Sequence, residues 1–116
     1  MVDKMKVIIA GSRSIDDHNI IFPIINKSPF EITEVVSGMA KGVDQVGTAW
    51  ALYSQTHVQE FIPDWSIGKH AGFLRNSLMA DYADALITIW DGKSKGTEHM
   101  ISEMIKRKKP IFLEFV

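Results

Sequence analysis

The 116 residues of the sequence predict a single α/β domain in which a parallel five-stranded sheet lies between two layers of helices. Two observations lead to this fold class. Five short apolar runs alternate with longer segments whose apolar residues recur at helical spacing, which is the pattern of repeated strand–helix units. The apolar runs are nearly continuous, as expected of strands buried on both faces of a parallel sheet. We find no linker, repeat or low-complexity tract, so residues 1–116 are expected to form one domain of ordinary size.

The predicted strands and helices alternate strictly along the chain. The first strand, MKVIIA, ends at Gly11, and Pro63 stops the third. Strands are predicted at residues 5–10, 34–37, 58–62, 85–90 and 110–116, and helices at about 16–26, 43–55, 71–82 and 97–108. Right-handed crossovers favour a Rossmann-like sheet of strand order 3-2-1-4-5. Such a sheet binds its ligand at the carboxyl ends of the strands, near the reversal between strands 1 and 4.

Each helix is predicted to bury one apolar stripe against the sheet. Asp16 or Asp17 is expected to cap the first helix, and Pro23 kinks this helix or marks a late start. Thr97 is predicted to cap the last helix. The predicted inward residues are Ile20, Ile21, Ile24 and Ile25 in the first helix, Leu74, Leu78 and Tyr82 in the third, and Met100, Ile101, Met104 and Ile105 in the fourth.

The composition excludes several classes of function. The chain has no cysteine, which excludes disulfides, a thiolate nucleophile and cysteine-based zinc sites. Its four histidines show no metal-ligand spacing, so no metal is expected. The formal net charge of −1 argues against a protein that grips long nucleic acid through phosphate contacts. The apolar run before Gly11 is too short for a signal peptide or a membrane span, so a cytoplasmic protein without membrane contact is expected.

The stretch VVSGMAKGVD, residues 35–44, organises the predicted site. Two valines end a strand, then Ser37, Gly38 and Gly42 permit a tight turn, and a helix follows. A helix N-terminus after a small-residue turn presents free backbone N–H groups and favours an anion. Lys41 adds a positive charge in the same turn. The alternative is a turn that only reverses the chain.

Four loops meet at the carboxyl edge of the predicted sheet, namely residues 11–14, 37–42, 63–69 and 91–97. Each of these loops contains glycine or serine together with lysine or arginine. A nearly neutral protein that gathers cations at one edge is suited to a small anionic ligand, most simply one that carries phosphate. The alternative for any single lysine is a solvated loop charge. The candidate ligand-binding residues are Gly11, Ser12, Arg13, Ser37, Gly38, Lys41, Gly42, Asp44, Asp64, Trp65, Lys69, Arg75, Asn76, Asp91, Ser94, Lys95, Gly96 and Thr97.

Several of these side chains indicate particular roles. Arg13 follows a glycine–serine pair and is placed to form bidentate hydrogen bonds with a phosphate group. Trp65 lies in a loop and is a candidate for stacking on a base. His99 is either an acid–base group or an ordinary surface histidine. Three carboxylates are interpreted as acceptors for ribose hydroxyls, namely Asp44, Asp64 and Asp91. The alternatives are that Asp44 caps its helix and that Asp91 only ends a strand.

Taken together, these motifs resemble the SLOG superfamily, and more closely its small stand-alone YspA-like members, which occur in bacteria and phages. The resemblance covers nearly the whole chain and rests on GSR at 11–13, VSGMAKGVD at 36–44, the segment from PDWSIGK to DGKSKGT at 63–97, and PIFLEF at 110–115. It implies a Rossmann-like fold that binds a nucleotide or a nucleotide-derived, ADP-ribose-like ligand at the edge described above. It also implies a homodimer or higher oligomer paired through helices, for which Trp50 is either a contact or a core residue.

Two relatives in this superfamily indicate alternative functions. The Lonely Guy enzymes hydrolyse nucleoside monophosphates at the base–ribose bond with the motif PGGxGTxxE, in which the glutamate is catalytic. The matching segment DGKSKGTEHM keeps Gly96 and Thr97 but has Met100 at the glutamate position, while Arg75 resembles the arginine that supports that glutamate. Methionine is neither a base nor a nucleophile, so no catalytic residue is assigned. DNA-processing protein A has a similar SGxAxGxD turn and binds single-stranded DNA.

The sequence therefore predicts binding or sensing of a phosphate-bearing nucleotide or a related ligand, with no cofactor assigned beyond that ligand. The alternatives are hydrolysis of an N-glycosidic or phosphate bond and binding of single-stranded DNA. An enzyme is disfavoured by Met100, and a DNA-binding role by the small size and the net charge of −1.

Overall fold

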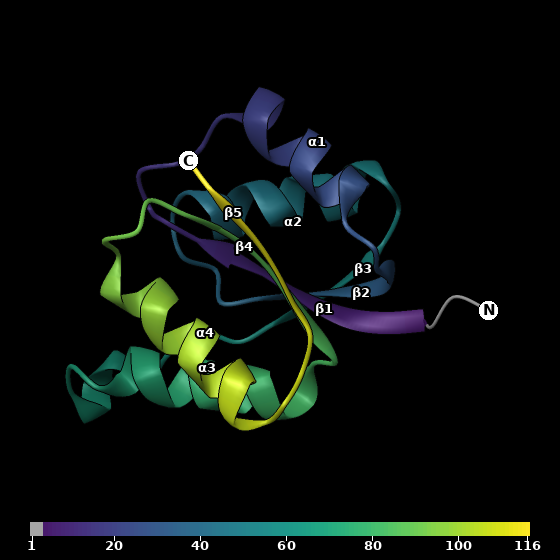
Figure 1. The fold of residues 1–116 in the computed structure, drawn as a ribbon. Helices are drawn as coiled ribbons and strands as arrows, with labels where there is room; N and C mark the ends of the chain where they lie inside the picture. Colours follow the sequence, from purple (N-terminus) through teal and green to yellow (C-terminus); the bar gives the residue numbers. More distant parts are fainter. Residues whose placement is uncertain (1–3) are drawn as a thin grey trace.

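The computed structural model describes residues 4–116 and confirms the predicted α/β architecture (Figure 1). Its five strands form one parallel sheet in the order β3-β2-β1-β4-β5, so the predicted reversal between β1 and β4 is confirmed. The strands are β1 (Lys4–Gly11), β2 (Glu31–Ser37), β3 (His57–Glu60), β4 (Ala85–Trp90) and β5 (Ile111–Phe115).

Four α-helices cover the sheet, two on each face. Figure 1 shows α1 and α2 on one side of the strands and α3 and α4 on the other. The helices are α1 (His18–Lys27), α2 (Val43–Tyr53), α3 (Ala71–Tyr82) and α4 (Lys95–Lys106), and a short 3-10 helix η1 (Trp65–Ile67) precedes α3. None of the helices in residues 4–116 combines the length and the apolar character needed to cross a membrane.

The central strand β1 supplies side chains to both halves of the core because successive strand residues point to opposite faces. Val7 and Ile9 pack in the cluster beneath α1 and α2, while Ile8 and Ala10 pack in the cluster beneath α3 and α4. Burial of each large aliphatic side chain contributes roughly 1.5–3 kcal/mol. The near-continuous apolar character of this strand therefore reflects a sheet that is covered on both sides.

Several element boundaries differ from the prediction. Strand β2 begins at Glu31 because the segment predicted as a loop already pairs with the start of β1, where a register shift lies between Met5 and Lys6. Helix α2 ends at Tyr53 because Gln55 adopts a positive φ of 59°. Asp17 does cap α1, with its side chain accepting a hydrogen bond from the Asn19 N–H at 2.8 Å.

The predicted inward face of α3 is wrong for its two leucines, whereas the third predicted residue, Tyr82, is half-buried and packs against the core beneath α3 and α4. Leu74 and Leu78 are 48% and 58% exposed. The buried residues of this helix are Ala71, Asn76, Met79 and Ala80. Small and polar side chains occupy this face because α3 packs closely on α4 and also lines a cavity beside the sheet. The spacing of Leu74 and Leu78 does place them on one face of the helix, but that face is exposed to solvent and does not meet the sheet.

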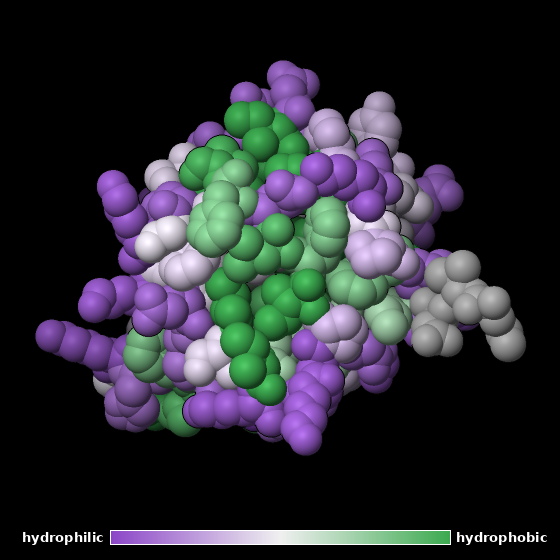
Figure 2. All heavy atoms as spheres, in the orientation of Figure 1, coloured by the Kyte–Doolittle hydropathy of each residue, from purple (hydrophilic) through white to green (hydrophobic). Residues whose placement is uncertain are grey.

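The other helix faces are mostly as predicted. Ile21, Ile24 and Ile25 of α1 are buried, and so are Met100 and Met104 of α4; the outermost predicted members, Ile20 and Ile105, are exposed. Trp50 of α2 is half-buried and packs against the core beneath α1, where its indole N–H donates to the Asn26 side chain at 2.9 Å. Figure 2 shows a band of hydrophobic side chains across the face on which β5 runs.

Candidate functional site

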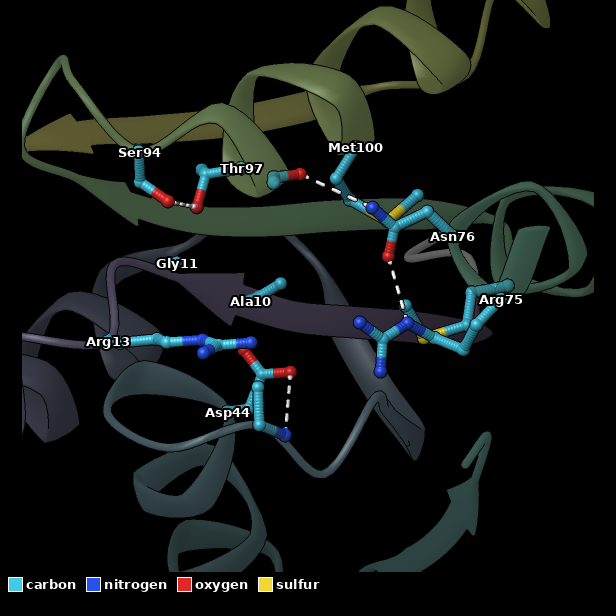
Figure 3. A pocket seen from close by; sticks show the side chains of 12 residues that line it. Ala10, Gly11, Arg13, Asp44, Arg75, Asn76, Ser94, Thr97 and Met100 are labelled. Carbon is cyan, nitrogen blue, oxygen red and sulfur yellow. Dashed lines mark hydrogen bonds between the residues drawn. The ribbon is translucent and has the colours of Figure 1, made fainter. Parts of the chain in front are cut away.

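A cavity of about 70 Å³ lies at the carboxyl edge of the sheet, where β1 ends and where α2 and α4 begin (Figure 3). We call it the inner cavity. It occupies the reversal between β1 and β4, the position at which open parallel sheets bind ligands. Its walls are formed by Ala10, Gly11, Arg13, Ala40, Asp44, Arg75, Asn76, Met79, Ser94, Gly96, Thr97 and Met100.

The loops around the inner cavity are held together by close backbone contacts. A Cβ on Gly11 would lie 2.1 Å from the Ile89 carbonyl oxygen, so only glycine fits there. Gly42 has a φ of +79° and begins α2, and its Cβ position would lie 2.4 Å from the Ser12 carbonyl oxygen. The buried Ser12 hydroxyl in turn accepts a hydrogen bond from the Asp91 N–H at 2.9 Å. These contacts fix the positions of three of the four predicted loops.

Two arginines from different elements reach the inner cavity. Arg13 comes from the loop after β1, and Arg75 lies in the second turn of α3. The Arg75 guanidinium donates through Nε to the Asn76 side-chain oxygen at 3.0 Å and through Nη1 to the Gly38 carbonyl. Burial lowers the pKa of Arg75, but Asp44 opposes that shift and the group stays cationic. Within residues 4–116 neither guanidinium forms an ion pair within 4 Å, so both remain available to an anion.

Asp44, the second residue of α2, places a carboxylate in the wall of the inner cavity. It is 5% exposed, and its Oδ2 accepts from the Ala40 N–H at 3.4 Å. Burial raises the pKa of Asp44 to about 6, against the opposing effects of Arg75, of the backbone N–H groups of Ala40 and Gly11, and of Arg13. The side chain does not cap its helix, because Gly42 is the N-cap of α2.

The start of α4 forms the opposite wall. Ser94 is its N-cap, so the predicted cap at Thr97 is wrong; Thr97 lies inside the first turn and donates to the Ser94 hydroxyl at 3.3 Å. The first N–H groups of any helix lack partners inside it. The rest of the described chain offers no acceptor to the N–H groups of Lys95, Gly96 and Thr97. This helix end therefore presents free donors and a partial positive charge beside the cavity.

Asn76 connects the arginine to the start of α4. Its amide oxygen accepts from Arg75, and its Nδ2 donates to the Gly96 carbonyl at 3.2 Å and lies 3.2 Å from the Nδ1 of His99. Because Nδ2 is a donor, Nδ1 must accept, which places the proton of a neutral imidazole on Nε2. Burial lowers the pKa of His99 and favours this neutral form. His99 itself lies outside the inner cavity and stacks on Phe73 with ring centroids 4.2 Å apart.

A second hollow of about 320 Å³, the outer groove, adjoins the inner cavity. The two share Arg13, Ala40 and Arg75 in their walls. Trp65 is 57% exposed in the outer groove and lies against Gly72 of α3, where an added Cβ would be 3.3 Å from the indole ring. An exposed tryptophan face beside apolar side chains is suited to a flat ring. The remaining wall residues are Gly38, Met39, Lys41, Ile62 and Pro63.

The structure brings most, but not all, of the predicted site residues together. The predicted residues in the inner cavity are Gly11, Arg13, Asp44, Arg75, Asn76, Ser94, Gly96 and Thr97, and the outer groove adds Gly38, Lys41 and Trp65. Lys95 lines a separate hollow beside Phe73 and His99. The predicted residues that line none of these hollows are Ser12, Ser37, Gly42, Asp64, Lys69 and Asp91.

Most of these outlying residues instead shape the loops. Ser37 accepts from the Met39 N–H at 3.1 Å, and Gly42 and Ser12 make the close contact described above. Asp64 accepts from the Ser66 side chain and N–H, and Asp91 accepts from two backbone N–H groups of its own loop; these bonds lower the pKa of both carboxyls. Asp64 thus caps the short helix η1, and Asp91 holds the loop that follows β4.

Sequence reasoning missed Ala10, Ala40 and Met79 as wall residues, and it considered Met100 only as a core residue and as the position of the absent catalytic glutamate. Ala10 and Ala40 are neighbours of the glycines that were singled out, and their small size lets the cavity open there. Met79 lies one turn beyond Arg75 and Asn76 on α3, so the helical spacing from those two residues was the available signal.

The fold and the site define a Rossmann-like α/β domain whose carboxyl edge offers two arginines without an ion pair among residues 4–116, together with an open helix N-terminus. A family model described as the YspA, cpYpsA-related SLOG family (YAcAr) matches residues 5–68, and the chain belongs to this family. Membership indicates nucleotide-related binding or processing. No curated protein matches the chain.

Among solved structures, the chain is similar to DNA processing protein A (DprA) from Streptococcus pneumoniae. The TM-score is 0.72 at 18% sequence identity, and the likeness covers 93% of this chain and 49% of that one. The chain therefore spans about half the length of the DprA chain. At this identity the comparison establishes the shared fold.

Proposed function

We propose that this protein binds a phosphate-bearing nucleotide or a nucleotide-derived ligand across the inner cavity and the outer groove. The observation that carries the proposal is the meeting of Arg13, Arg75 and the open start of α4 around one cavity. Guanidinium groups without carboxylate partners and free helix N–H groups together favour a phosphate. The family membership supports the same class of ligand.

The outer groove supports a nucleotide rather than a bare phosphate. Ligand pockets for small molecules commonly measure about 300–1,000 Å³. The inner cavity of about 70 Å³ is too small for a whole nucleotide, but the adjoining groove of about 320 Å³ has the room for a base. Trp65 offers that base a stacking surface, and base–aromatic stacking contributes roughly 1–3 kcal/mol.

The proposal is tested by a binding screen on the purified chain. Thermal shift and calorimetry would compare nucleoside mono-, di- and triphosphates, NAD, ADP-ribose and cyclic dinucleotides. A ligand at a hundredfold excess over its dissociation constant raises the free energy of unfolding by about 2.7 kcal/mol. Arg13→Ala should weaken binding by roughly 10–100-fold, as for a lost charged hydrogen bond. Lys4→Ala removes an exposed cation at the opposite edge of the sheet and should leave the affinity unchanged.

Two results would contradict the proposal: a wild-type protein that binds none of these molecules, or an Arg13→Ala variant that binds as well as the wild type. Binding to single-stranded DNA that tightens with strand length and falls steeply with salt would instead favour the DNA-binding alternative.

A hydrolase is the second candidate, and one observation favours it. Burial raises the pKa of Asp44 to about 6 inside a cavity that also holds two arginines, and catalytic acids and bases typically have such shifted values. Met100 also lines this cavity and brings no acid–base group. The same panel separates the two functions when each mixture is analysed for free base and released phosphate. An intact ligand after long incubation supports a binding protein, and a product that Asp44→Asn no longer forms supports the enzyme.

A further inference from the structure

The inner cavity has two walls of opposite chemistry (Figure 3). On one side, Ser94 and Thr97 mark the start of α4, where free backbone N–H groups attract an anion. On the other side, Asp44 presents a carboxylate, which accepts hydrogen bonds and repels an anion. Ala10 and Gly11 lie between them. A ligand that touches both walls must therefore carry a negative group and a hydrogen-bond donor.

The local structure uses little of the acceptor capacity of Asp44. A carboxylate has about four lone-pair positions. The backbone N–H groups of Ala40, at 3.4 Å, and of Gly11 are the donors that residues 4–116 supply, and no cation of this part of the chain lies within 4 Å. Burial of an incompletely paired carboxylate costs free energy. The free-energy cost of burying Asp44 with so few local contacts is best explained by a ligand group that binds to its carboxylate in the cavity.

We infer that Asp44 accepts a hydrogen bond from a hydroxyl group of the ligand, and that the site selects phosphorylated sugars over simple anions. This inference rests on the proposed function, and it adds the chemical feature that the site recognises beside the phosphate. A ribose hydroxyl donates to the carboxylate, whereas a second phosphate oxygen in the same place would be repelled. Arg13 and Arg75 balance the charge of Asp44 and of the phosphate together.

The size of the inner cavity agrees with a sugar phosphate. At 10–15 Å³ for each water-sized group, about 70 Å³ holds roughly five to seven such groups, which is enough for a phosphate group and the nearest hydroxyl of a sugar. The ligand then continues past the shared arginines into the outer groove, where Trp65 lies. In this arrangement Asp44 determines specificity through contact with the sugar and not through the base.

The inference is tested by matched ligands on the wild-type protein. Calorimetry would compare each common ribonucleoside monophosphate with its 2′,3′-dideoxy analogue, and ribose 5-phosphate with inorganic phosphate. The ribose-containing ligand of each pair should bind roughly 10–100-fold more tightly, as expected for a hydrogen bond to a charged acceptor. This comparison needs no variant, so it does not depend on how a substitution affects folding.

Variants then assign the preference to Asp44. Asp44→Ala should reduce the preference for the hydroxyl-bearing ligand to within about threefold while inorganic phosphate binds as well or better, because the repulsive charge is gone. Asp44→Asn keeps an acceptor oxygen and should give an intermediate preference. Glu31→Gln, at the opposite edge of the sheet, is the matched control and should keep the wild-type ratio.

The outcomes separate this inference from the proposed function. Ribonucleotides and dideoxynucleotides that bind the wild type equally well would overturn the inference and leave nucleotide binding intact. A preference that survives in Asp44→Ala would also overturn it, because another group would then hold the hydroxyl. A wild-type protein that binds no nucleotide and no sugar phosphate would overturn both.

Discussion

Arg75 on α3 donates a hydrogen bond from Nη1 to the backbone carbonyl of Gly38, which follows directly on the end of β2. The contact joins a helix on one face of the sheet to the turn that leads into α2 on the other face. It holds the guanidinium at the boundary between the inner cavity and the outer groove. Position rather than charge alone thus distinguishes Arg75 from the lysines of the surrounding loops.

Gly38→Ala should move Arg75 without removing its charge. An added Cβ would lie 2.6 Å from Nη1 of Arg75, and the flexible guanidinium is the group that can yield. The fold should persist, while ligand affinity falls by roughly tenfold because the displaced guanidinium loses its proposed hydrogen bond to the phosphate of the ligand. Calorimetry on the ligand found in the screen measures this change. Unaltered affinity in Gly38→Ala would show that the placement of Arg75 has no part in binding.

Two glycines of the site should respond in opposite ways to alanine. Gly42 has a φ of +79°, and its Cβ would meet the Ser12 and Arg13 carbonyl oxygens at 2.4 and 2.5 Å, so Gly42→Ala should lower the free energy of unfolding by several kcal/mol. Gly96 lies in the first turn of α4 with no heavy atom of the described chain within 4 Å of its Cβ position. Gly96→Ala should therefore stabilise the fold, by up to about 1 kcal/mol.

The Gly96→Ala variant also tests the site, because Gly96 lines the inner cavity. Its added methyl group would occupy space that the ligand needs and would crowd the free N–H groups beside it. We expect Gly96→Ala to combine an equal or higher free energy of unfolding with weaker ligand binding. Chemical denaturation and calorimetry on the same samples measure both quantities. Wild-type affinity in this variant would place the ligand away from the start of α4.

The fold was predictable from local patterns because the two central strands, β1 and β4, carry continuous buried runs that face both layers of helices. Continuous apolar runs such as that of β4 identify strands without knowledge of their partners, and strict alternation with helices leaves few topologies. The face of α3 was not predictable in the same way. Leu74 and Leu78 mark an apolar stripe, but the core beneath α3 and α4 receives Met79 and Ala80. Which face of α3 meets the sheet depends on its packing against α4, a tertiary contact that the leucine spacing does not contain.

The candidate site was predictable as a set of loops but not as a set of contacts. Topology alone brings Arg13, Arg75 and the start of α4 to one edge. Whether a loop residue faces the cavity depends on backbone angles and hydrogen bonds that a sequence pattern does not contain. Lys69 is exposed outside both hollows, and Asp64 and Asp91 turn back to their own loops. Asp44 is buried at the start of α2, next to the turn in which Gly42 approaches the Ser12 and Arg13 carbonyl oxygens, and this contact between two loops is also absent from the sequence pattern.

Glu103 should stabilise the contact between α3 and α4. Its buried carboxylate accepts from the Ser77 hydroxyl at 2.6 Å and from Lys106 at 2.9 Å, and Arg107 lies at 3.3 Å. These hydrogen bonds, that of Ser77 first, lower the pKa of Glu103 to about 2. Glu103→Gln should reduce the free energy of unfolding at pH 7 by about 1–3 kcal/mol, because hydrogen bonds to a charged group are lost.

The pH dependence of the free energy of unfolding is the control for the Glu103 prediction. A lowered native pKa means that its stabilisation is present above the unfolded value of about 4.5 and is lost as the pH falls toward 2. The difference between the wild type and Glu103→Gln should therefore shrink in acid. Glu98→Gln, on the exposed face of the same helix, should change stability little at any pH. A Glu103→Gln variant as stable as the wild type at pH 7 would contradict this account.

Asp44 should act on stability in the opposite direction. Burial raises the pKa of its carboxyl from the ordinary value of 3.8 to about 6 in the folded protein. Between these values the folded state binds more protons at Asp44 than the unfolded state does, so the contribution of Asp44 to stability is most favourable below pH 3.8 and is lost as the pH rises through 6. The shift corresponds to about 3 kcal/mol. Asp44→Asn removes this titration, so its stability relative to the wild type should rise by about 2–3 kcal/mol between pH 4 and pH 7.5. Urea unfolding of both proteins across this range measures the change, and parallel stability curves would show that the folded protein does not hold Asp44 with a raised pKa.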